Sequence, residues 1–187
     1  MEELKHCGTI LVETNRLILK KIENADAEDM FLNFAHDDRV SRYMSWDSFK
    51  TVEDSIKWIN EWQDEYNKED VYYWGIYLKS SHKLIGTIYL LTESTVSKVG
   101  SLSYCLGFDY WGNGYVCEAA EAVIDFAFNK AGYNRVEAYH AKSNLQSARV
   151  LQKVGMKKEG TLRQRCKTHN GYEDCIYYSI LKSEFKS

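Results

Sequence analysis

The stretch that decides the fold runs Tyr110-Trp111-Gly112-Asn113-Gly114-Tyr115-Val116-Cys117-Glu118-Ala119, and an apolar helical pattern follows it. The first turn of a helix has unpaired backbone N–H groups and a partial positive charge. Glycine has no Cβ atom, so Gly112 and Gly114 let those N–H groups close around an anionic phosphate. The stretch favours a phosphate-binding turn; the alternative is a plain strand–turn–helix corner in which the glycines only form the turn.

The helix is indicated by apolar residues that recur with a period of about 3.6 residues. They are Val116, Ala119, Ala120, Val123, Ile124 and Ala127. Gly132 suits the position just after the end of such a helix. Upstream, residues 101–106 alternate in polarity, which is typical of a strand. The expected order is therefore strand, tight glycine turn and helix.

Two familiar nucleotide-binding loops do not fit this turn. A P-loop has Lys after its second glycine, and here Asn113 follows Gly112. A dinucleotide-binding fingerprint has a third glycine where this chain has Cys117. The turn is therefore expected to bind a different phosphate-bearing group.

A second motif follows the strand-like residues 135–141. Its pieces are Asn144-x-x-Ser147, Lys153-x-Gly155-Met156 and Glu159-Gly160. Together with Trp111-Gly112-x-Gly114-Tyr115 and Glu118-Ala119, they make the chain resemble the GNAT N-acetyltransferase superfamily. It looks most like the branch that contains the ribosomal-protein N-terminal (alanine/serine) acetyltransferases. The resemblance runs from Glu13-Thr14-Asn15-Arg16-Leu17 to about Leu181.

This resemblance implies an α/β (α+β) fold: a mixed, mostly antiparallel sheet of six or seven strands with splayed central strands and about four helices. The sequence patterns place helices at 28–35, 51–66, 115–130 and 144–153, and strands at 16–22, 72–78, 84–91, 101–106, 135–141, 157–166 and 173–181. We expect residues 1–187 to form a single acetyltransferase domain, with 1–12 as an N-terminal extension.

The resemblance also implies a cofactor site for acetyl-CoA as the acetyl donor, without a metal. Backbone N–H groups of Gly112, Asn113, Gly114, Tyr115 and Val116 would bind the coenzyme A pyrophosphate. The backbone of Leu106 would pair with the pantetheine arm and help to hold the thioester oxygen. One departure from the family concerns a side chain: Asp109 stands where Gln or Arg is usual, three positions before the first glycine.

Asn144 and Ser147 have two interpretations. A capping box of Ser143 and Gln146 would make this segment an ordinary helix start. The resemblance instead makes Asn144 a pantetheine ligand and Ser147 a catalytic residue that donates a hydrogen bond to the departing thiolate. A tyrosine acid is usual in the superfamily at the position of Leu151, so that role is vacant.

Other titratable residues are expected to be structural. In the branch that this chain resembles, a glutamate base lies where Cys166 stands, and we interpret Cys166 as a buried structural thiol. His140 and Glu118 are expected to stabilise the fold, the latter because its charge suits the start of a helix. Tyr104 alternates along its strand and faces either the core or the cleft.

The vacant tyrosine and glutamate positions bear on which class of amine accepts the acetyl group. An α-amine with a pKa of about 8 is roughly a quarter neutral near pH 7.5, whereas lysine, with a pKa of about 10.4, is only about 0.1% neutral. A site without a carboxylate or tyrosine partner therefore favours a peptide N-terminus. A polyamine or antibiotic acetyltransferase and a non-catalytic acetyl-CoA sensor are the alternatives.

The charge, the apolar stretches and the cysteines of the chain limit the kinds of partner and compartment that we expect. The chain has 24 basic and 27 acidic residues and a net charge of −3, without a basic run, so we expect no nucleic-acid partner. No apolar stretch is long enough for a signal peptide or a membrane span. The five cysteines lack metal-binding spacing, which indicates reduced thiols in the cytoplasm. A monomer or a homodimer is expected.

Overall fold

The computed structural model describes residues 3–169 and 171–186, which form an eight-stranded sheet in the order β1-β2-β3-β4-β5-β6-β8-β7. All neighbouring strands are antiparallel except β5 and β6. The strands are β1 Val12–Glu13, β2 Leu17–Lys20, β3 Tyr72–Leu78, β4 Leu84–Ser94, β5 Val99–Leu106, β6 Arg135–Ala141, β7 Lys157–Thr168 and β8 Gly171–Leu181. The mixed, mostly antiparallel sheet confirms the expected fold class.

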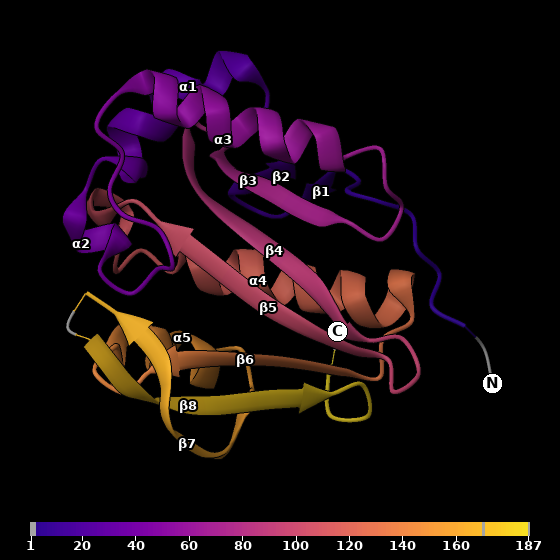
Figure 1. The fold of residues 1–187 in the computed structure, drawn as a ribbon. Coiled ribbons are helices and arrows are strands. Elements are labelled where there is room, and N and C mark those ends of the chain that lie inside the picture. Colours follow the sequence, from indigo (N-terminus) through magenta and orange to yellow (C-terminus); the bar gives the residue numbers. More distant parts are fainter. Residues whose placement is uncertain (1–2, 170, 187) are drawn as a thin grey trace.

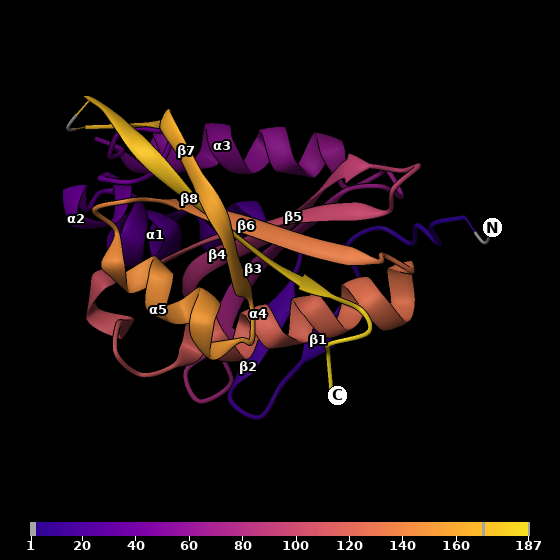
Figure 2. The same ribbon diagram turned by 90° about the horizontal axis from the view of Figure 1, so that it is seen from below.

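Helices cover both faces of the sheet. They are α1 Ala27–Met30, α2 Asp38–Ser41, α3 Val52–Glu65, α4 Tyr115–Asp125 and α5 Leu145–Lys153. Two of them, α1 and α4, continue as π-helical turns at Phe31–Ala35 and Phe126–Ala131. Figure 2 shows α3 on one face of the sheet, and α4 and α5 on the opposite face.

The long helices begin and end where their sequences predict. Thr51 and Asp54 form a reciprocal capping box at the start of α3. The apolar stripe of α4 is buried against the sheet, and Gly132 ends the helical segment in the left-handed region with φ +82°. This packing fixes where the first turn of α4 lies relative to β5.

The splayed strands that the family resemblance implied are β5 and β6 (Figure 1). Their parallel pairing covers only Val99–Ser101 against Arg135–Glu137. Beyond Ser101, β5 stays paired with β4 as far as Leu106, while β6 follows β8 to Ala141. The two strands therefore separate towards their C-terminal ends, next to the first turns of α4 and α5.

The sheet has eight strands where six or seven were expected, and a short helix was missed. β1 spans two residues and α2 spans four, too few to show a period of two or 3.6 residues. Asn170, in the expected turn between the last two strands, lies outside the described residues. No helix in the described part of the chain is long and apolar enough to cross a membrane.

Candidate active site

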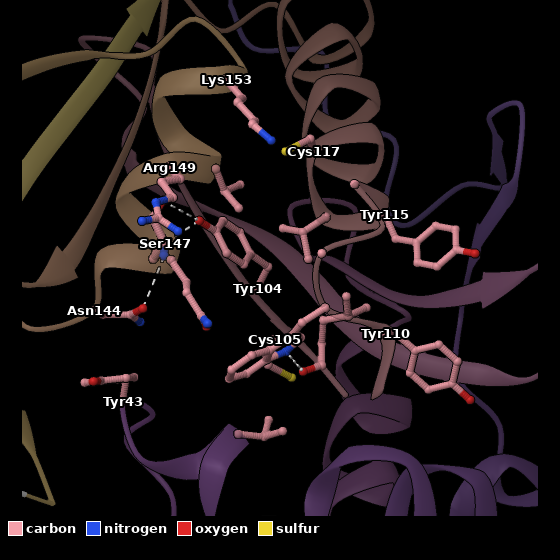
Figure 3. A pocket seen from close by; sticks show the side chains of 18 of the residues that line it. Tyr43, Tyr104, Cys105, Tyr110, Tyr115, Cys117, Asn144, Ser147, Arg149 and Lys153 are labelled. Atoms are coloured by element: carbon pink, nitrogen blue, oxygen red, sulfur yellow. Dashed lines mark hydrogen bonds between the residues drawn. The ribbon is translucent and has the colours of Figure 1, made fainter. Parts of the chain in front are cut away.

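A pocket of about 310 Å³ opens between the end of β5, the first turns of α4 and α5, and the segment around α2 (Figure 3). Its lining combines Leu106, the glycine turn, Asn144 and Ser147 with Arg39, Arg149 and Lys153. No Asp or Glu of the described residues belongs to this lining. In a chain of net charge −3, this concentration of basic side chains favours an anionic ligand.

The glycine turn has the conformation that its sequence predicts. Gly112 and Gly114 have φ values of +78° and +79°, a region that other residues rarely adopt. A Cβ atom built on Gly112 would contact nothing within 4 Å, so the backbone angle alone explains glycine there. Gly114 is the N-cap of α4 and no side chain caps this helix, which leaves its first N–H groups available to a ligand.

Asn113 has a side chain that holds the turn together. Its Nδ2 donates to the carbonyl oxygens of Tyr110 at 3.2 Å and Trp111 at 3.1 Å. The Asn113 side chain is therefore structural, and only its backbone is available for the expected phosphate contact. Tyr115 and Val116, the other two residues expected to donate N–H groups, line the pocket.

Leu106 lies at the point where β5 and β6 separate. The N–H of Gly107 donates to the carbonyl of Ile85 at 2.9 Å, so strand alternation turns the backbone groups of Leu106 away from β4. Its carbonyl accepts a 2.7 Å hydrogen bond from Nε1 of Trp111. Its N–H has no strand partner among the described residues, because the pairing with β6 has already ended.

Asn144 is the N-cap of α5, and its Oδ1 accepts a 3.2 Å hydrogen bond from the backbone N–H of Ser147. The alternative interpretation, a capping box of Ser143 and Gln146, is therefore wrong, because Asn144 caps the helix. Its Nδ2 has no partner among the described residues, so capping the helix and binding a ligand in the pocket are compatible.

Tyr104 is the site residue that the sequence could not place. Figure 3 shows its ring directed at the start of α5, and its hydroxyl lies 2.9 Å from Oγ of Ser147. Burial raises the pKa of Tyr104 well above its usual range, although the hydrogen bond with Ser147 partly opposes this. Tyr104 is therefore a neutral phenol near pH 7 and keeps a proton to donate.

The basic residues of the pocket differ in their surroundings. Arg39 forms an ion pair with Asp37, with 2.6 Å between Nη2 and Oδ2. Its guanidinium lies 3.7 Å from the centre of the Phe108 ring. Lys153 on α5 points towards Cys117 on α4, while Arg149 is exposed along the same edge of the pocket. Lys153 therefore lies beside the first turn of α4, where a phosphate would bind, and Arg149 lines the same pocket from α5.

The remaining candidates do not belong to the pocket lining. Leu151 is completely buried in the core. His140 is buried, and Nδ1 of its ring donates to the carbonyl of Ala141 at 2.8 Å. Cys166 forms a disulfide with Cys175 between β7 and β8, so the expectation of five reduced thiols was wrong for this pair.

Comparison with known proteins agrees with this geometry. The family model "Acetyltransferase (GNAT) domain" matches residues 16–157, which is most of the chain. The chain belongs to the GNAT family of N-acetyltransferases. The match agrees with the resemblance that the glycine turn and the second motif carried, and with the splayed strands that this resemblance implied.

Similar GNAT proteins cover nearly the whole chain. YoaA, an uncharacterized N-acetyltransferase of Bacillus subtilis, is 32% identical over 92% of this chain and 97% of its own length. A GNAT-family acetyltransferase structure from Bacillus anthracis has a TM-score of 0.81 at 25% identity, covering 94% of this chain and all of its own. The ribosomal-protein-S5-alanine acetyltransferase of Vibrio fischeri has a TM-score of 0.80 at 23% identity, covering 95% of this chain and all of its own.

The disulfide gives a direct test of the cysteine chemistry. Cys7, Cys105 and Cys117 are free. Purified without reductant and unfolded in guanidinium chloride, the protein should therefore show three titratable thiols, and five after reduction. Its intact mass should be two hydrogen atoms lower before reduction than after. Five thiols without reduction would show that Cys166 and Cys175 are not paired.

Proposed function

We propose that this protein transfers the acetyl group of acetyl-CoA directly to a primary amine, and that the acceptor is a protein or peptide N-terminus. The observation that carries the proposal is one pocket that unites the uncapped start of α4, the unpaired N–H of Leu106 and three basic side chains. No group of three or more potential metal ligands occurs among the described residues.

The pocket suits the donor because coenzyme A is an elongated polyanion. Its pyrophosphate would accept hydrogen bonds from the N–H groups of residues 112–116, with the helix dipole adding attraction. Lys153 lies beside the first turn of α4 and Arg149 lines the same pocket, so both would attract these charges. Asn144 lines the pocket and would donate from Nδ2 to an amide oxygen of the pantetheine arm.

In the reaction, the neutral amine attacks the thioester carbonyl carbon, an N–C bond forms and the C–S bond breaks. The N–H of Leu106 would donate to the carbonyl oxygen as it gains negative charge. Ser147 would donate its hydroxyl proton in a hydrogen bond to the departing sulfur, while Tyr104 donates to Ser147. The attacking amine loses its proton to water.

The lack of a carboxylate in the described pocket lining supports this acceptor class. The expected lack of a tyrosine partner was wrong, because Tyr104 lies beside Ser147, but its raised pKa makes it a proton donor and not a base. No carboxylate among the described residues lines the pocket, so no such group is placed there to deprotonate a lysine ammonium or to bind a polycation. An α-amine is substantially neutral without help at physiological pH. The ribosomal-protein-S5-alanine acetyltransferase of Vibrio fischeri, whose name gives a protein acceptor, shares this fold.

The donor site is tested by calorimetry with acetyl-CoA on the wild-type chain and on Gly114→Glu. The substitution places a bulky anion at the glycine turn, so we expect binding to be lost. Gly160→Glu is the matched control, because a Cβ atom there contacts nothing within 4 Å and the position is on β7, away from the pocket lining. Equal affinity of Gly114→Glu and wild type would contradict the phosphate site.

The acceptor class is tested with paired peptides. One has a free N-terminus and arginine in place of every lysine, and the other has a blocked N-terminus and one lysine. We expect mass spectrometry to find acetylation of the first and at least about tenfold less of the second at pH 7.5. A faster reaction of the lysine peptide, or of spermidine, would overturn the N-terminal assignment.

The role of Ser147 is tested by Ser147→Ala. Since a thiol with a pKa of about 8.5 leaves with little help, we expect kcat to fall by about tenfold, at the low end of general acid effects. Acetyl-CoA affinity should change less than about twofold, because this hydroxyl acts mainly on the transition state. Ser143→Ala, at the exposed position before the helix, is the control. An unchanged kcat in Ser147→Ala would remove Ser147 from the mechanism.

A further inference from the structure

Arg16 contacts the glycine turn although it lies 97 residues earlier in the chain than Asn113. Its Nη1 donates to the carbonyl oxygen of Asn113 at 2.9 Å, and its guanidinium lies 4.6 Å from the centre of the Tyr115 ring. Gly112 and Gly114 line the pocket, but Arg16 and Asn113 do not. Arg16 therefore contacts the turn from the side that faces away from the pocket.

This contact fixes the direction of one peptide group. The peptide between Asn113 and Gly114 is planar and trans, so its C=O and N–H point in opposite directions. Because Arg16 holds the carbonyl oxygen behind the turn, the N–H of Gly114 points to the pocket side. Glycine permits other orientations of this peptide, since no Cβ atom restricts its φ angle. Arg16 selects the orientation that an anionic ligand requires.

Arg16 also neutralises a charge beside the turn. Glu118, in the first turn of α4, accepts hydrogen bonds from Oγ1 of Thr14 at 2.6 Å and from the backbone N–H and Nε of Arg16, both at 2.7 Å. Partial burial alone would raise the pKa of Glu118, but these hydrogen bonds outweigh it and the pKa is lowered. Glu118 is thus an anion at neutral pH, and without Arg16 it would repel a phosphate.

The sheet holds the main chain of Arg16 in place. Its carbonyl accepts a 2.9 Å hydrogen bond from the N–H of Lys79, which follows β3. Oγ1 of Thr14 accepts a 3.0 Å hydrogen bond from the N–H of Leu17, the first residue of β2. The guanidinium is therefore presented from a rigid element, as the orientation of a binding group requires.

We propose that Arg16 is a positioning residue for the pyrophosphate of the acetyl donor. It turns the N–H of Gly114 into the pocket and cancels the charge of Glu118, without contacting the ligand itself. This inference rests on the proposed use of acetyl-CoA. It also supplies a cation to a turn in which Asp109 stands at the position where the family usually has Gln or Arg.

The test compares two donors by calorimetry: acetyl-CoA, and acetyl-pantetheine, which has no pyrophosphate or adenosine. For Arg16→Met we expect the Kd of acetyl-CoA to rise about tenfold to a hundredfold, the scale of one charge-assisted hydrogen bond. The Kd of acetyl-pantetheine should stay within about twofold. Arg16→Lys keeps the charge, but one nitrogen replaces the two, Nε and Nη1, that bind Glu118 and Asn113. Its acetyl-CoA affinity should therefore lie between those of wild type and Arg16→Met.

Two further variants separate the two effects of Arg16. Adding Glu118→Gln to Arg16→Met removes the uncompensated anion, so part of the lost acetyl-CoA affinity should return. Lys79→Met removes a neighbouring surface cation that pairs with Glu13 at 2.8 Å, and it should leave both Kd values unchanged. Should Arg16→Met not fold, Arg16→Lys carries the test, with selective weakening of acetyl-CoA binding as the expected result.

Each contrary result has a distinct meaning. An unchanged acetyl-CoA Kd in Arg16→Met overturns the positioning role, and so does an equal loss for both donors, which would indicate a general weakening of the fold. If the wild-type chain binds neither donor, the proposed function fails and the role of Arg16 fails with it.

Discussion

The structure depends on the early end of the pairing between β5 and β6. Because their parallel ladder stops after Ser101, each strand remains paired only on its other edge, and the gap between them runs to the first turns of α4 and α5. The N–H of Leu106 is left unpaired in this gap, which is unusual for a buried strand. A continuous sheet would satisfy that group and leave no room for a thioester.

The same geometry gives an acidic protein a basic pocket. The chain has an excess of acidic residues, yet the pocket lining contains Arg39, Arg149 and Lys153 and no carboxylate from the described residues. Glu118, the acidic residue in the first turn of α4, faces away from the lining and is bound by Arg16. The ion pair of Glu118 and Arg16 therefore lies on the outer side of the turn, while the basic side chains of the lining face the pocket.

The sequence predicted what depends on local periodicity and backbone angles. The bounds of β3 and β6, the start of α3 near residue 51 and the glycine turn before α4 all follow from neighbouring residues. Contacts between distant residues could not be read in this way. Neither the hydroxyl pair of Tyr104 and Ser147 nor the disulfide of Cys166 and Cys175 has a local signature, because each needs the register of non-adjacent elements. The bond of Arg16 to the glycine turn is hidden for the same reason.

The central claim is that one ligand binds both the glycine turn and the open end of β5. Titrating the ¹⁵N-labelled protein with acetyl-CoA and following its amide resonances tests this claim directly. The account predicts that the largest shifts occur at residues 112–117 and at Leu106, two regions joined by the pocket. A separate hollow is lined by residues that include Lys5, Phe128 and Tyr133. Shifts concentrated there, with residues 112–117 unchanged, would contradict the account.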